Sequence, residues 1–213
     1  MNFFSPDSKF AQVMTAVGEM MLLNVCWLVA SLPLVTMGTA NIAMYTLMGR
    51  RLRGEGSGTI IPFFKAWLSN LKPGVLFWIP QVLITCSLGT IFFLPLPTFP
   101  KLVAGILLAL VTLVFSIIYP QVARFRNRWF AYLRNGLILL ISKFGWVLLN
   151  MLLLLLPVIL FLLAPVDFLR FGFIWMLFGF SLLFYLSAKI MQNVLQPLEF
   201  LSESRKPSVT ITY

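Results

Sequence analysis

The segment from Ser31 to Gly54 reads SLPLVTMGTANIAMYTLMGRRLRG, and it decides how the chain enters and leaves the membrane. It lies in an uncharged run, Met20–Gly49, that is long enough to cross a bilayer once and begin to return. Pro33 and Gly38 interrupt the run and favour a turn. A helix starting at Pro6 reaches Pro33 after about 40 Å, at about 1.5 Å per residue, which exceeds a hydrocarbon core of about 30 Å. We therefore expect a turn near the outer boundary, rather than a helix break that lines a site.

The composition identifies an integral membrane protein. The chain has 213 residues, of which 60% are hydrophobic and only 10% are charged. A soluble domain carries about a quarter charged residues. The net charge is +10, and the basic residues cluster at the ends of apolar runs, as in proteins that follow the positive-inside rule. We therefore expect one membrane domain over residues 1–213, with the lipid bilayer and not nucleic acid as its surroundings.

Further charge-free runs are long enough, or nearly so, to cross a bilayer. They are Pro73–Pro100, Leu102–Ala123, Phe144–Val166 and Phe171–Ala188. With the first run they predict an all-α, polytopic helical bundle of five crossings. A sixth crossing follows if the first region crosses at about 13–33 and returns at about 35–51, which is the interpretation that the turn favours.

The basic residues orient the predicted bundle. Loops 50–72 and 124–143 hold ten of the sixteen lysines and arginines, whereas the alternate loops hold Lys101 and the pair Asp167 and Arg170. Both basic loops are therefore expected in the cytoplasm, together with the C-terminus. The N-terminus is outside with five crossings and inside with six.

Two amphipathic segments lie in these basic loops. TIIPFFKAWLSNLK (59–72) and RFRNRWFAYLRNG (124–136) place apolar and aromatic side chains among basic and polar ones. They predict two helices lying in the cytoplasmic interface. Their likeness suggests a weak internal repeat of 59–100 and 125–166. They either anchor in lipid headgroups or bind a partner, with candidate partner-binding residues Phe63, Phe64, Trp67, Arg124, Arg126, Trp129 and Tyr132.

The sequence shows no catalytic, cofactor-binding or metal-binding pattern. It has no histidine and two cysteines, in separate apolar runs. We therefore predict that the protein is not an enzyme. Glu19 is either a functional carboxylate within the membrane or a residue at headgroup level. The amides in or beside the apolar runs are expected to hydrogen-bond between helices; they are Asn24, Asn41, Gln81, Gln121 and Asn150.

The run LNVCWLVASLPLVTMGTANIAMYTLMGRRLRGEG (23–56) resembles the N-terminal signature of the YesL-like bacterial membrane proteins, a family of unknown function. The family's turn pattern, Pro-x-x-Thr-x-Gly-x-Ala followed by a Tyr, falls on Pro33, Thr36, Gly38, Ala40 and Tyr45. The run YPQVARFRNRWFAYLRNGLILLI (119–141) is similar to the family's middle segment.

The resemblance implies a multi-pass protein of the bacterial plasma (inner) membrane. Genes of such proteins often lie beside those of carbohydrate importers of the ABC class. This context implies an accessory protein that binds or stabilises the permease subunits of such an importer, and it implies no catalytic residues. The alternative is a stand-alone small-molecule transporter or channel, which the repeat and the interrupted first region suggest. A homo-oligomer is compatible with both.

Overall fold

The computed structural model describes residues 9–55 and 58–203. The expected helix start at Pro6 and the C-terminal residues 204–213 lie outside these ranges. All the secondary structure of the described residues is helical, so the all-α prediction is confirmed. The elements are α1 (Lys9–Ser31), η1 (Leu34–Thr36), α2 (Met37–Leu52), α3 (Ile60–Ser69), α4 (Leu71–Thr90), α5 (Thr98–Arg124), α6 (Trp129–Ser142), α7 (Phe144–Leu163), α8 (Pro165–Arg170), α9 (Gly172–Ile174), the π-helical turn η2 (Trp175–Gly179) and α10 (Phe180–Glu203).

Five helical segments of the described chain are long and apolar enough to cross a membrane. They are Phe10–Ser31, Leu71–Thr90, Thr98–Arg124, Phe144–Leu163 and Gly172–Leu198. No more than 39% of the most apolar part of each is buried inside the protein, so these helices offer wide apolar faces to lipid. The second span ends at Thr90 and not near Pro100, because Pro95 and Pro97 interrupt the helix before α5 begins.

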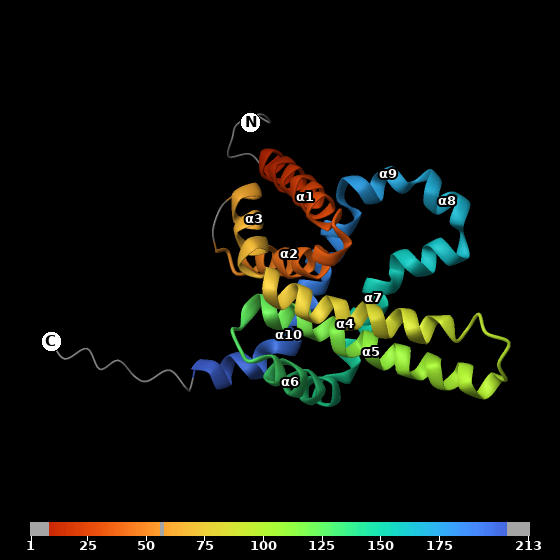
Figure 1. Ribbon diagram of the computed structural model, residues 1–213. Coiled ribbons are helices and arrows are strands. Elements are labelled where there is room, and N and C mark those ends of the chain that lie inside the picture. Colours follow the sequence, from red (N-terminus) through yellow and green to blue (C-terminus); the bar gives the residue numbers. More distant parts are fainter. Residues whose placement is uncertain (1–8, 56–57, 204–213) are drawn as a thin grey trace, which may run out of the picture.

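Helix α2 is the centre of the bundle. It packs against α1, α3, α4, α5 and α10, and Figure 1 shows it enclosed by its neighbours. Its 16 residues span about 24 Å, short of a hydrocarbon core of about 30 Å. Most of its side chains are buried, including Ile42, Met44 and Met48 at 0% exposure. α2 is therefore covered by protein rather than by lipid.

The interrupted first region is a turn, as predicted. The Thr36 hydroxyl closes it by donating to the carbonyl oxygens of Ala30 and Pro33, each at 2.9 Å. Its tip is apolar and exposed at Leu32 and Leu34. The indole N–H of Trp78 on α4 donates to the Leu34 carbonyl at 2.7 Å. This bond attaches the turn to α4.

Short helices precede two of the candidate spans. α3 leads into α4, and α6 leads into α7. Both pairs fall within the segments of the predicted repeat, 59–100 and 125–166, so each segment contains a short helix followed by a 20-residue helix. This shared order is compatible with a repeat, which stays a prediction.

Candidate functional site

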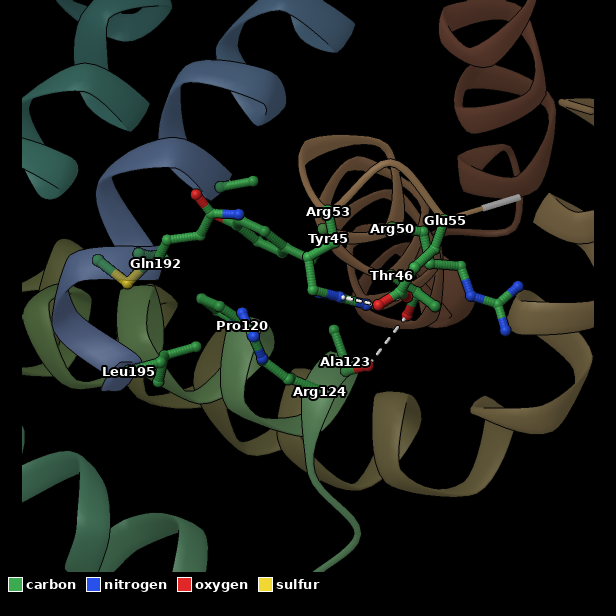
Figure 2. Close-up of a pocket in the computed structure, with 13 residues that line it drawn as sticks. Tyr45, Thr46, Arg50, Arg53, Glu55, Pro120, Ala123, Arg124, Gln192 and Leu195 are labelled. Atoms are coloured by element: carbon green, nitrogen blue, oxygen red, sulfur yellow. Dashed lines mark hydrogen bonds and ion pairs between the residues drawn. The ribbon is translucent and has the colours of Figure 1, made fainter. Parts of the chain in front are cut away.

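A cavity of about 270 Å³ opens where the C-terminal ends of α2 and α5 meet α10. We call it the basic cavity. Figure 2 shows side chains entering it from these helices and from the turn after α2. Its polar lining consists of Tyr45, Thr46, Arg50, Arg53, Glu55, Arg124 and Gln192. The Thr46 hydroxyl lies 3.5 Å from the Ala123 carbonyl and connects α2 to α5.

The arginines of the basic cavity converge on one carboxylate. The guanidinium of Arg53 donates two hydrogen bonds to Glu55, at 2.7 and 2.9 Å. These bonds are the main reason why the pKa of Glu55 is lowered from its ordinary value, and the charges of Arg53, Arg50 and Arg124 lower it further. Arginines from two segments far apart in the sequence therefore stabilise the same carboxylate, that of Glu55.

A groove of about 550 Å³ continues from the basic cavity toward α3. We call it the basic groove. Arg50 and Arg124 line both hollows, whereas Lys65 and Arg126 line the groove but not the cavity. Basic residues are favourable at the negative C-terminal ends of α2 and α5. Among the described residues, five basic residues and one acid, Glu55, thus line the two hollows.

A third cavity, of about 160 Å³, lies between α2, α4, α5, α7 and α10. We call it the inner cavity. Its lining combines hydroxyl and amide groups with aromatic rings. The lining residues are Asn41, Tyr45, Trp78, Gln81, Thr112, Phe115, Ser116, Tyr119, Met151, Leu154 and Phe184.

Tyr45 belongs to both the basic cavity and the inner cavity. Its hydroxyl lies 2.6 Å from the Ser187 hydroxyl, and Ser187 donates to the Asn150 amide oxygen at 2.5 Å. These bonds hold the tyrosine between α2, α7 and α10. The side chain of Tyr45 therefore separates a cationic hollow from a polar hollow deeper in the bundle.

Interhelical bonding is confirmed for four of the five amides. Asn24 bonds to η2 and α10, Asn41 accepts from the Trp27 indole, Gln81 accepts from the Tyr119 hydroxyl, and Asn150 accepts from Ser187. Gln121 is fully buried, and neither polar atom of its side chain has a hydrogen-bond partner in the part of the chain that is described.

The predicted partner-binding residues do not form one surface. Phe63 and Tyr132 are buried, and Phe64 and Trp67 are half-buried. Tyr132 instead holds the link between α5 and α6, because its hydroxyl donates to the Phe125 carbonyl at 2.6 Å. Phe63 and Tyr132 therefore offer nothing to a partner in this structure.

Other members of the predicted set lie in the two basic hollows or at the surface. Arg124 lines both hollows, and Arg126 lines the basic groove. Trp129 is 49% exposed. Within the amphipathic segments 59–72 and 124–136, the most exposed large apolar residues are Ile61, Leu68 and Phe130. The helical spacing of apolar residues does not single out Ile61 as exposed, because apolar residues occupy more than one face of α3.

Glu19 has a specific partner. Its carboxylate lies 2.9 Å from the guanidinium of Arg51, at the C-terminal end of α2. Arg51 also donates to the Thr59 hydroxyl at 3.1 Å. Both charged side chains are partly exposed, so this pair favours the headgroup-level interpretation of Glu19. It also ties the first half of α1 to the start of the loop after α2.

No group of three or more cysteine, aspartate or glutamate residues lies close enough to hold a metal ion within 9–55 and 58–203. Cys26 is buried in α1, and Cys86 is exposed on α4. The chemistry that the hollows offer is therefore hydrogen bonding and positive charge.

The fold and its hollows define a polytopic, all-helical membrane protein with a cationic cavity at the ends of its central helices. Residues 20–91, about a third of the chain, match the model of a family described as a protein of unknown function, DUF624. The matched part contains the turn, α2, α3 and α4, but not α5 and α10, which complete the basic cavity. Neither the curated proteins nor the solved structures contain a match to the chain.

Proposed function

We propose that this chain is an accessory protein of a carbohydrate ABC importer, which binds or stabilises the permease subunits. The family match includes the signature turn that resembles the YesL-like proteins, and that resemblance carries the sugar-uptake context. The observation that carries the docking role is the exposure of apolar side chains outside the candidate spans. We call them together the docking surface; it comprises two patches, Ile61 and Leu68 on α3, and Trp129 and Phe130 at the start of α6.

The docking surface is suited to a protein partner at the cytoplasmic surface of the membrane. Ile61 is 81% exposed and Phe130 is 65% exposed, on helices too short to be candidate spans. Basic residues lie beside them along the chain, including Lys65 and Arg128. Aromatic and apolar anchors surrounded by polar groups are typical of binding hot spots.

Replacing the docking surface should separate the protein from its partner. We expect permease subunits to co-purify with the tagged full-length chain from its native host in mild detergent. Ile61→Ser combined with Phe130→Ser should lower their yield at least tenfold, because a single hot-spot residue contributes about 2 kcal/mol or more to binding. Ile141→Ser is the control, because Ile141 is 83% exposed but lies at the far end of α6.

An unchanged permease yield in the double variant would count against this surface. Purification of the chain alone would favour the alternative, a stand-alone transporter or channel. That alternative is supported by Tyr45, which lines both the basic cavity and the inner cavity. Amides, hydroxyls and aromatic rings in the inner cavity could bind a sugar, so flux of labelled sugars into liposomes would then be the decisive measurement.

We propose that the protein lies in the bacterial plasma membrane with both termini in the cytoplasm. Loops 50–72 and 124–143 carry the basic residues that orient the bundle. The pair between Glu19 and Arg51, at 2.9 Å, supports the same side for the first half of α1. A single crossing between these two residues would separate them by a hydrocarbon core of about 30 Å. The pair therefore supports the interpretation in which the chain crosses the membrane at about 13–33 and returns to the cytoplasmic side at about 35–51.

Cysteine labelling tests this orientation. In a Cys26→Ala/Cys86→Ala background, Gln12→Cys should not react with a membrane-impermeant maleimide on intact cells, and should react after permeabilisation. Lys101→Cys, at the start of α5, is the matched position expected on the outer side and should react on intact cells. Reaction of Gln12→Cys on intact cells would refute the cytoplasmic N-terminus.

A further inference from the structure

The basic cavity and the basic groove together form a concave cationic site. Arg50 and Arg53 come from α2 and the turn after it, Lys65 comes from α3, and Arg124 and Arg126 come from the end of α5 and the residue pair beyond it. A chain that needed these residues only for its orientation could place them anywhere along the loops. Here, three separate segments bring them to two adjoining hollows.

The site already holds one anionic group of the chain itself. Arg53 donates two hydrogen bonds to the Glu55 carboxylate, and Arg50 and Arg124 add to the positive field around it. Glu55 is exposed and follows a glycine at positive φ, Gly54 at 69°. The carboxylate therefore occupies the edge of the site and can be displaced by a stronger anion.

The remaining lining suits a phosphate group. Arginine binds phosphate oxygens through paired N–H donors, in a geometry that lysine cannot reproduce. Thr46, Gln192 and Asn70 add neutral hydrogen-bonding groups to the two hollows. With one carboxylate against five basic residues, the described part of the lining carries a strong positive excess.

We infer that the basic cavity and basic groove bind a phosphate group, either that of an anionic lipid headgroup or that of a phosphorylated solute. Arg50 is the central residue of the site, because it lines both hollows and has no carboxylate within ion-pair distance in the described chain. The groove shares Ile61 with the docking surface, but the variants that test phosphate binding change only charged residues outside that surface, so either proposal can fail without the other.

Binding is measured on the delipidated full-length protein in a neutral detergent, by the shift of its thermal unfolding. The probes are phosphatidylglycerol, glycerol 3-phosphate and inorganic phosphate. The wild type should be stabilised by at least one of them. Arg50→Gln/Arg126→Gln should weaken that binding about tenfold or more, because it removes two charge-assisted donors. Arg128→Gln/Arg134→Gln removes the same charge from exposed residues that line neither hollow, and should weaken binding less than twofold.

Glu55→Gln is a second variant whose effect has the opposite sign. It removes the carboxylate that competes for Arg53, so binding should become about threefold tighter, as expected for the release of an exposed ion pair. A gain of affinity cannot come from misfolding. An unchanged or weaker affinity in Glu55→Gln would contradict the assigned site.

The probes distinguish the two sources of the phosphate. Stabilisation by phosphatidylglycerol alone would support the lipid headgroup, whereas stabilisation by glycerol 3-phosphate or inorganic phosphate would support a soluble ligand. Equal weakening in the two double variants would show diffuse surface attraction and overturn the inference. Failure of all three probes to stabilise the wild type would overturn it as well.

Discussion

Gly74→Ala should destabilise the protein by about 3 kcal/mol, at the upper end of the range for an overpacked core. For a chain of this length, this corresponds to a fall of about 6–12 °C in the unfolding temperature. A Cβ atom at Gly74 would lie 2.2 Å from the hydroxyl oxygen of Thr39 and 2.6 Å from its Cα atom. The backbone of α2 would have to move, and α2 is the helix on which the bundle packs. The measurement is the fraction of purified protein that stays monodisperse after heating.

The clash at Gly74 belongs to a close contact between α2 and α4. Gly38 is its counterpart, because a Cβ atom there would lie 2.5 Å from the Trp78 Cβ and 2.7 Å from the Gly74 carbonyl oxygen. Small residues let helix backbones approach in membranes, where packing rather than exclusion of water drives association. The contact also positions Tyr45, two turns further along α2.

Gly89→Ala is the matched control, since Gly89 lies on the same helix and a Cβ atom there would have no neighbour within 4 Å. It should change the stability by less than about 0.5 kcal/mol, as a surface substitution does. If Gly74→Ala and Gly89→Ala had the same unfolding temperature, the close approach of α2 and α4 would be refuted.

The candidate spans could be predicted because membrane helices are long apolar runs bounded by charges and prolines. The packing of α2 could not. Gly74 and Gly89 lie in the same apolar run, and nothing in the sequence distinguishes them. Only the tertiary structure shows that Gly74 contacts α2 and that a Cβ atom at Gly89 would have no neighbour within 4 Å. Gly38 was recognised as part of a turn pattern, but its role extends to the contact with α4.

The candidate site was only partly visible for a similar reason. Arg50 and Arg124 were identified as cationic loop residues, yet their convergence depends on how α2 and α5 meet. The amphipathic pattern makes Phe63 a candidate partner-binding residue, yet it is buried, because an apolar side chain packs equally well against lipid and against protein. Hydrophobic periodicity therefore does not distinguish these two surroundings within a membrane.

The second large effect is expected at Asn24, which is fully buried in α1. Its amide nitrogen donates to the carbonyl oxygens of Trp175 and Met176, at 3.0 and 2.6 Å, and its amide oxygen accepts from the backbone N–H of Ser181 at 2.9 Å. These three residues flank or form the π-helical turn η2. A π-helical turn departs from the regular α-helical ladder, so its backbone groups need other partners.

Asn24→Leu should therefore cost about 2 kcal/mol, taking about 0.6 kcal/mol for an average hydrogen bond in a membrane protein and up to about 1.7 kcal/mol for the strongest. Leucine has a similar size, so the loss reports the three hydrogen bonds rather than a cavity. The unfolding temperature should fall by about 4–8 °C. Hydrogen exchange should accelerate at Ser181, whose N–H loses its acceptor.

Asn41→Leu is the matched control for Asn24→Leu. Asn41 is an amide on the neighbouring helix, and it accepts one side-chain hydrogen bond, from the Trp27 indole at 2.9 Å. Its replacement should cost about a third as much and leave exchange at Ser181 unchanged. Equal losses in the two variants, with no change of exchange at Ser181 in either, would mean that Asn24 does not hold η2. A larger loss of stability for Asn24→Leu would show that one side chain of α1 satisfies the irregular backbone of the last span. Asn24 would then help to hold α10, whose Ser187 contacts the Tyr45 hydroxyl.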